Sequence, residues 1–477
     1  MAATEDARAT GRALPARRID RSGRVRVDYR AIAALALPLM LNSSVHAVIS
    51  LTDTWFVGHI SSTAMAGMAS IYWLVIFYVV LFSGVGLAVQ TLVAQAEGGR
   101  RHRRAGHALW VAIWGSLLTL PLFAIAGFTA APALAAAGVE PEVRRLALEF
   151  WWPRMLGAPI GVMLWAIFGF FNGISRPAIT LVTMLVVALA NAGLNQLLIF
   201  EFGYGMAGAA WATNLSMLLG TVLALAVFTG RSVRSRYRSD ITWRFDARGL
   251  RRQLRIGLPM GLLYAADIFG MAVFQLMQVR LSQVDGAATQ LVMMLTSMIY
   301  MPGVGIALAG TTLVGQAIGA GDREWARQLG NSVIGLAVCF MGCLGLVVAA
   351  LGPWLLPKFL SPGDMNGAEL VRLGSVLLWI AAGYQLFDGL NLGSAFSLRG
   401  AGDASVPAAL AIGLSWGFFI PLAHSLSFDP GQGFVGFLPQ MGLGAVGGWL
   451  ALLAYVAALG TALFLRWRSQ AWKAIRI

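Results

Sequence analysis

Long apolar runs recur along the whole chain and decide its fold class. The chain has 477 residues, of which 58% are hydrophobic and 12% are charged, about half the charged fraction of a soluble domain. A membrane-spanning helix needs about 20 apolar residues, and about twelve runs reach that length. They lie at residues 31–57, 64–96, 107–130, 145–172, 178–200, 206–229, 253–283, 287–317, 327–351, 367–397, 404–427 and 441–466. The sequence therefore predicts an all-α polytopic membrane protein with twelve transmembrane helices.

Positive charge is concentrated between these runs and indicates how the chain crosses the membrane. The net charge is +14, and most arginines and lysines fall on one side of a twelve-span arrangement. They lie in residues 8–30, 100–104, 231–255 and 466–476, and at Arg176, Arg323, Arg327 and Arg399. The positive-inside rule places this side and both termini in the cytoplasm, where a basic face suits anionic lipid head groups rather than nucleic acid.

The chain ends outside the apolar runs are expected to be cytoplasmic tails. Residues 1–30 lack the apolar core of a signal peptide and are predicted to form a basic, disordered tail. Residues 467–477 form the second tail.

An internal repeat divides the chain into two halves. Pro38, Gly84 and Gly98 recur as Pro259, Gly305 and Gly319, each 221 residues later and without a gap. Each half holds an even number of spans, so both halves start on the same side of the membrane. We therefore predict two six-helix lobes, at residues 31–229 and 253–466, joined by a cytoplasmic linker at 230–252. Lobes of this kind are related by a pseudo-two-fold axis along the membrane normal, and substrate sites usually lie between them.

The first half carries a carboxylate deep inside an apolar run, Asp53. An acid in a membrane helix is energetically costly and is a functional candidate by default. Counting helical rise puts Asp53 at roughly the same depth as Asn191, Asn195 and Thr213. Carboxylate, amide and hydroxyl oxygens suit Na⁺ or a protonatable site, so these residues form the first candidate cation site. Interhelical hydrogen bonds that hold the lobe together are the structural alternative.

The second half carries two carboxylates near the midplane, Asp267 and Asp388. Counting rise places them roughly 20 Å and 15 Å from the cytoplasmic ends of their spans, so they could share one cavity. A hydrogen-bonded structural carboxylate is again the alternative. Polar side chains on the same helix faces and nearby, together with His46 of the first half, are candidates for the substrate cavity: Tyr264, Gln278, Tyr300, Tyr384, Gln385 and Asn391. His46 could be a proton-linked switch or only a hydrogen-bonding partner.

The sequence argues against catalysis. Its only lysines are Lys358 and Lys473, so it has no P-loop lysine and no means of ATP hydrolysis. A membrane-embedded enzyme would need a nucleophile with a histidine or metal set at one depth, and the candidates do not form one. We expect a monomer that is not an enzyme, with no cofactor and no metal beyond a possible Na⁺.

A series of short sequence segments, in the order in which they occur along the chain, resembles the multidrug and toxic compound extrusion (MATE) family and, within it, the bacterial NorM-like branch. They are TDTWFVGH from Thr52, NGIS from Asn172, GMAGAAWAT from Gly205, VGQAIGAGD from Val314 and SLRGAGD from Ser397. The resemblance implies a secondary antiporter in the bacterial inner membrane, which exports organic, often cationic, compounds in exchange for Na⁺ or H⁺. It implies that the acids of both halves take part in cation coupling. Members of this branch usually carry Glu where Asp267 stands, and other branches have an acid where Asn195 stands.

A flippase for lipid-linked saccharides of a related superfamily is the second candidate function. Such a protein is expected to show many cationic side chains in its central cavity, to meet phosphate groups. The deep charges identified above are acidic, which favours the antiporter.

Overall fold

The structure is a computed structural model of the chain and describes residues 14–20, 24–136, 138–359 and 367–475. Twelve helical segments in this part of the chain are long and apolar enough to cross a membrane, which confirms the predicted fold class. The unbroken spans of the first half are α2 (Tyr29–Gly58), α3 (Ser62–Gly98), α7 (Pro141–Gly173) and α9 (Gly205–Thr229). Those of the second half are α11 (Ala247–Leu281), α12 (Gln283–Gly319), α13 (Arg323–Leu355, extended by the 3₁₀ turn η2, Leu356–Phe359), α14 (Gly367–Gly400) and α17 (Gly444–Arg468).

Three spans are interrupted. The third consists of α4 (His102–Leu118), α5 (Leu120–Gly127) and α6 (Ala130–Ala136). The fifth is α8 (Pro177–Asn195) followed by the π-helix η1 (Gln196–Glu201). The eleventh is α15 (Ser405–Leu414), the π-helix η3 (Ser415–Phe419) and α16 (Ile420–Ser427). The fifth and eleventh spans hold the same place in the two halves, so the π-helical turn is a repeated feature, and such turns often lie at functional sites.

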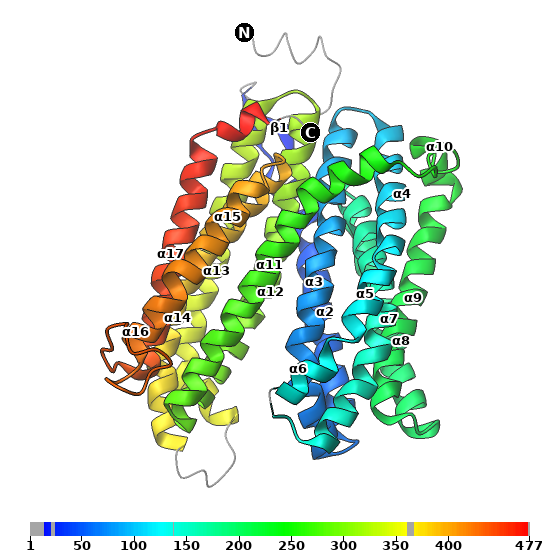
Figure 1. Ribbon diagram of the computed structural model, residues 1–477. Helices are drawn as coiled ribbons and strands as arrows, with labels where there is room; N and C mark the ends of the chain where they lie inside the picture. Colours follow the sequence, from blue (N-terminus) through cyan, green and yellow to red (C-terminus); the bar gives the residue numbers. More distant parts are fainter. Residues whose placement is uncertain (1–13, 21–23, 137, 360–366, 476–477) are drawn as a thin grey trace.

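The helices form two lobes, as the repeat predicts. Figure 1 shows α2 to α9 on the right and α11 to α17 on the left, with the short linker helix α10 (Arg231–Tyr237) beside the first lobe. The hairpin of β1 (Arg17–Ile19) and β2 (Val25–Val27) and the end of α17 lie at the same end of the bundle (Figure 1). We call this end the terminal side and the opposite end the far side. The short 3₁₀ turn η4 (Ala471–Ala474) follows α17.

On the terminal side the two lobes meet at a pair of equivalent contacts. A Cβ atom at Gly98 would lie 1.9 Å from the carbonyl oxygen of Gln316, and one at Gly319 would lie 2.0 Å from the carbonyl oxygen of Gln95. Gly98 and Gly319 are 221 residues apart, and so are Gln95 and Gln316. The same backbone contact is therefore made twice, once by each lobe, and only glycine leaves room for it.

A second equivalent pair lies nearer the middle of the bundle. A Cβ atom at Gly84 would lie 2.5 Å from the backbone nitrogen of Gly261, and one at Gly305 would lie 2.3 Å from the backbone nitrogen of Met40. These positions are again related by 221 residues. The interface thus follows the pseudo-two-fold axis that the repeat predicts.

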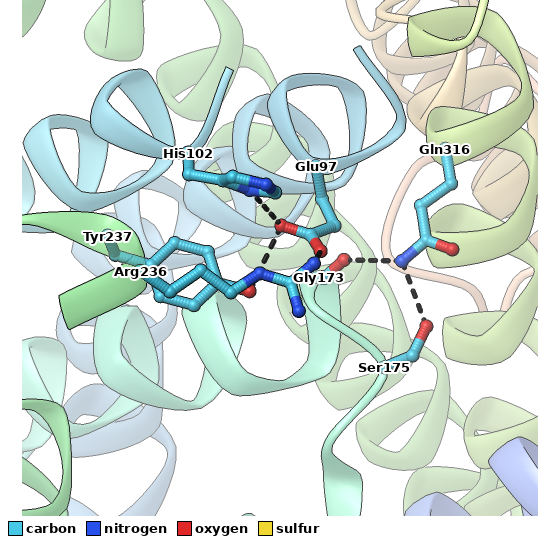
Figure 2. A network of polar contacts seen from close by, with 7 residues as sticks. All are labelled: Glu97, His102, Gly173, Ser175, Arg236, Tyr237 and Gln316. Atoms are coloured by element: carbon cyan, nitrogen blue, oxygen red, sulfur yellow. Dashed lines mark hydrogen bonds and ion pairs between the residues drawn. The ribbon is translucent and has the colours of Figure 1, made fainter. Parts of the chain in front are cut away.

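Hydrogen bonds between the lobes lie in the terminal half of the bundle throughout the described part of the chain. The Nε2 group of Gln95 donates to the carbonyl oxygen of Gly400 at 3.0 Å. The Nε2 group of Gln316 donates to the carbonyl oxygen of Gly173 and to the Oγ atom of Ser175, both at 2.9 Å (Figure 2). The lobes are therefore joined on the terminal side.

Arg399 belongs to this interface. Its Nη2 group donates to the Oε1 atom of Gln90 at 2.9 Å, and its backbone carbonyl oxygen accepts from Thr91. The side chain is 4% exposed. Arg399, counted among the charges of one side of the membrane, lies at the terminal-side end of α14, where the opposite lobe covers it.

Glu97 fixes the linker to the first lobe. Its carboxylate accepts from Arg236 at 2.5 Å and from the hydroxyl of Tyr237 at 3.0 Å, and it pairs with Nδ1 of His102 at 3.0 Å (Figure 2). Burial, together with the charge of Glu97, raises the pKa of Tyr237 above its usual range, so the phenol remains a donor. α10 is therefore anchored on α3 and α4.

Part of the N-terminal segment is ordered. Residues 17–19 and 25–27 pair as antiparallel strands, and the indole Nε1 of Trp325 donates to the carbonyl oxygen of Pro15 at 2.9 Å. The side chain of Asp28 caps α2 by accepting from the backbone of Arg30 and Ala31. The predicted disorder of this tail is wrong for these residues, because the hairpin bonds to itself and to α13; residues 1–13 lie outside the described part.

Candidate functional site

The polar residues predicted for the first lobe converge on Asp53. Asn191 and Asn195 donate from their Nδ2 groups to Oδ1 of Asp53, at 3.0 Å and 2.8 Å. The hydroxyl of Thr213 donates to Oδ2 at 3.3 Å. α2 supplies the acid, α8 supplies two amides one helical turn apart, and α9 supplies the hydroxyl. Counting helical rise therefore gave the correct grouping.

In this cluster the carboxylate of Asp53 is surrounded by amide and hydroxyl groups, which can act as hydrogen-bond donors or as oxygen ligands. All four side chains are buried. The Oδ1 atom of Asn195 is buried and has no hydrogen-bond partner in the described part of the chain. An amide can turn either its oxygen or its NH₂ group toward a neighbour, so the same side chains can serve a bare carboxylate or a bound cation.

Arg154 of α7 stands close to this cluster and was not among the predicted residues. Its charge acts on Asp53, and its Nη1 group donates to Oδ1 of Asn214 at 2.9 Å. A signal was present in the sequence, because Arg154 is a charged residue inside the apolar run at 145–172.

In the second lobe Asp267 and Asp388 lie close enough to influence each other's charge. The hydroxyl of Tyr455 donates to Oδ1 of Asp267 at 3.0 Å, and Nδ2 of Asn391 donates to Oδ1 of Asp388 at 3.1 Å. The Oδ2 atom of Asp388 is buried and has no hydrogen-bond partner in the described chain. The two acids therefore lie near each other, and one carboxylate oxygen is unsatisfied.

Tyrosines surround these acids. Tyr264, Tyr300 and Tyr384 all lie within electrostatic range of Asp267, and the last two also of Asp388. Tyr455 of α17 was missed by sequence reasoning, because a tyrosine in an apolar helix is not distinguishable from a packing residue. The phenols give the site aromatic faces and hydroxyl groups, a combination that suits organic cations.

Two predicted cavity residues serve other contacts. The Nε2 group of Gln385 donates to the carbonyl oxygen of Thr296 at 2.9 Å, so it ties α14 to α12. Gln278 is fully buried eleven residues beyond Asp267, where Gly448 leaves room for its amide. At 1.5 Å per residue this is roughly 16 Å along α11, which removes Gln278 from the acid cluster.

His46 lies in the first lobe against an aromatic ring. Its imidazole stacks on the indole of Trp165, with centroids 4.9 Å apart and planes at 12°. Its Nε2 atom is buried without a hydrogen-bond partner among the described residues. The position is one turn from Asn42, whose buried Oδ1 is likewise unpartnered.

The two sites use equivalent helices at different depths. Asp53 and Asp267 both come from the first helix of their lobe, and each accepts a hydrogen bond from a hydroxyl of the sixth helix, which is Thr213 in one lobe and Tyr455 in the other. Asp53 also accepts from Asn191 and Asn195 of the fifth. The repeat of Asp53 is Phe274, a fully buried residue seven positions beyond Asp267. The second site is therefore displaced by about two helical turns toward the terminal side.

Comparison with known proteins agrees with this architecture. The model of the MatE family matches residues 38–197 and 259–424, one segment in each lobe. A probable multidrug resistance protein NorM of Rhizobium meliloti (strain 1021) is 30% identical over 465 residues, covering 92% of both chains. A protein with the same name from Bradyrhizobium diazoefficiens is 31% identical over 448 residues, again covering 92% of both.

Solved structures share the fold. The crystal structure of a MATE transporter in complex with MaL6 superposes with a TM-score of 0.82 at 19% identity, covering 93% of this chain and 97% of that one. The eukaryotic MATE transporter AtDTX14 superposes with a TM-score of 0.79 at 20% identity, covering 94% and 98%. With the family match in both lobes and relatives at 30% identity over nearly the full length, the chain belongs to the MatE family and is a membrane transporter rather than an enzyme.

Proposed function

We propose that the protein is a secondary antiporter that exports organic, often cationic, compounds in exchange for Na⁺ or H⁺. The observation that carries this proposal is the buried Oδ2 atom of Asp388, which lacks a partner and lies beside a second acid, Asp267. A buried carboxylate oxygen without a partner is costly, and a proton, a Na⁺ ion or a cationic substrate would each relieve that cost. Competition among them for one acid is the basis of exchange.

Antiport also requires that the ligands prefer different conformations. A ligand with equal affinity for both states shifts no equilibrium, so the coupling ion must bind the substrate-releasing state better. The interface supports this scheme, because the lobes are joined on the terminal side and share no hydrogen bonds on the far side in the described chain.

The proposed orientation places the terminal side in the cytoplasm of a bacterium, with the protein in the inner membrane. The arginines at residues 100–104 and 231–255 support this, since basic loops face the cytoplasm. In this orientation the hydrogen-bonded side of the lobe interface faces the cytoplasm. We propose that the protein acts as a monomer, with the small-molecule substrate and membrane lipids as its partners and with no cofactor besides the coupling ion.

The names of the relatives support multidrug export rather than lipid flipping. Several curated relatives are named probable multidrug resistance protein NorM. A flippase would be expected to show many cationic groups in its cavity, whereas the second-lobe site is built around two acids, Asp267 and Asp388.

The coupling ion is tested with vesicles that contain the purified protein and a cationic dye. We expect dye movement against its gradient when one ion gradient is imposed, Na⁺ or H⁺, and no such movement when both are collapsed. Dye movement that depends on neither the Na⁺ gradient nor the H⁺ gradient would contradict antiport. Vesicles without protein are the control for leakage.

Asp53→Asn tests whether the first-lobe cluster carries the ion. The asparagine keeps the volume of the acid and can still accept from Asn191 and Asn195 through its oxygen, so the lobe should fold. We expect loss of ion-driven dye efflux, because a neutral amide cannot exchange a charge. Asp240→Asn, in the exposed linker, is the control. Unchanged ion dependence in Asp53→Asn would reduce the cluster to a structural role.

A further inference from the structure

A cavity of about 710 Å³ lies on the terminal side, at the seam between the lobes. Its walls include Gln95 and Gly319, whose backbones meet across the seam. α4 contributes from the first lobe, and α11 and the start of α13 contribute from the second. Neither acid cluster lines this cavity, so it is separate from the candidate transport site.

The cavity is lined by more positive charge than the chain itself neutralises. Arg101 and Arg104 come from the first lobe, and Arg252 and Arg323 come from the second. None of these four forms an ion pair with a carboxylate in the described part of the chain. Guanidinium groups bind phosphate oxygens through paired hydrogen bonds, so a convergent set of them suits a phosphate group.

The one acidic residue among the described lining residues is already engaged. Asp246 accepts from Nε2 of His107 at 3.1 Å and from the backbone of Arg248 at 2.9 Å. The hydrogen bond from His107 lowers the pKa of Asp246, so this carboxylate stays ionised and bonded. Asp246 pairs with His107 and with none of the four arginines in the described part of the chain.

A buried acceptor in the wall indicates a second feature of the ligand. Gln253 is 1% exposed, and its Nε2 group donates to the carbonyl oxygen of Ala108 across the seam. Its Oε1 atom is buried without a hydrogen-bond partner among the described residues. An acceptor of this kind is satisfied by a hydroxyl donor. The wall thus suits a ligand with anionic oxygens and a hydroxyl group.

We propose that this cavity binds a phosphate ester that carries a hydroxyl, and that the bound group joins the two lobes while the terminal side is closed. This inference does not depend on the coupling ion or on the exported compound. The arginines that would hold the phosphate come from both lobes, so parting of the lobes would dismantle the site. A ligand bound only in the closed state shifts the equilibrium toward that state. The same chemistry is offered by a glycerophosphate head group of a membrane lipid and by a soluble phosphate ester.

The test measures the unfolding temperature of the detergent-purified full-length protein. The probes are short-chain phosphatidylglycerol, glycerol 3-phosphate and glycerol. We expect a concentration-dependent rise with short-chain phosphatidylglycerol and none with glycerol. A rise with glycerol 3-phosphate as well assigns the site to soluble phosphate esters, and its absence assigns the site to lipid. No rise with either phosphate compound overturns the proposal.

Matched double variants locate the binding. Arg104→Gln with Arg252→Gln removes one lining arginine from each lobe, and we expect a loss of affinity of about tenfold for each arginine. Arg103→Gln with Arg251→Gln removes exposed neighbours of the same charge that do not line the cavity, and should bind as the wild type does. An equal loss of affinity in the two double variants would show that the effect comes from surface charge in general, and would overturn the proposal. If the lining pair unfolds without ligand, Arg323→Gln on α13 replaces it with the same expected weakening.

Discussion

Replacing Asp388 or Asp267 with asparagine is expected to reduce efflux of a cationic dye to the level of vesicles without the protein. Each amide keeps the shape of the acid and the hydrogen bond it accepts, from Asn391 in one case and from Tyr455 in the other. What is lost is the charge that a proton, Na⁺ or a cationic substrate would neutralise. The measurement is the initial rate of dye transport in vesicles with an imposed ion gradient.

Folding has to be separated from transport in this experiment. The two variants should reach the membrane in wild-type amounts and unfold near the wild-type temperature, since no hydrogen bond is removed. Asp240→Asn again serves as a control outside the spans, and it should transport normally. Wild-type efflux in both Asp267→Asn and Asp388→Asn would refute the role of the second-lobe acids.

Substituting alanine for both Gly98 and Gly319 is expected to keep the terminal side from closing. The two added Cβ atoms would lie 1.9 Å and 2.0 Å from carbonyl oxygens of the opposite lobe, where atoms normally stay beyond 3.0 Å. Backbone atoms cannot rotate away as a side chain can, so the lobes must separate on this side. The variant should populate the state that is open on the terminal side, and efflux should stop because the cycle cannot be completed.

Cysteine reactivity reports this opening. Thr91 is fully buried in the closed interface, where its hydroxyl donates to the carbonyl oxygen of Arg399 in the opposite lobe, so Thr91→Cys, made after Cys339 and Cys343 are replaced by serine, should react slowly with a water-soluble maleimide. The glycine variant should react much faster. Gly335→Ala provides the comparison, because a Cβ atom at that position meets nothing within 4 Å. Equal labelling of all three proteins would show that these glycines do not control closure.

The sequence was most informative where physical constraints are strong. Twelve spans followed from apolar length, because a bilayer demands about 20 residues per helix. The two-lobe arrangement followed from the 221-residue repeat, and the glycine pairs at the interface show why those positions are repeated. The Asp53 cluster could be predicted from depth, because Asn191, Asn195 and Thr213 lie at a similar depth in their spans and a buried acid requires hydrogen-bond partners.

Contacts that depend on lateral packing could not be predicted in the same way. Depth does not say which helices are neighbours, so Tyr455 was not linked to Asp267 and Gln385 was not linked to Thr296. The burial of Arg399 could not be predicted, because one sequence cannot show that a helix end is covered by the other lobe. The paired strands at residues 17–19 and 25–27 have too few apolar residues to indicate order by pattern, and the contact of Pro15 with Trp325 is tertiary.

The doubled glycine contact has a meaning for how such a chain can arise and diverge. Gly98 contacts Gln316, and their counterparts Gly319 and Gln95 contact each other in the same way. Two identical subunits related by a two-fold axis form contacts of this kind. Each half of the chain is therefore built like one subunit of a self-complementary dimer, with the partner supplied in the same polypeptide. Covalent fusion frees each half to change alone. Asp53 and Phe274 occupy equivalent positions in the two halves, yet only one of them is an acid. Two identical subunits could not differ in this way.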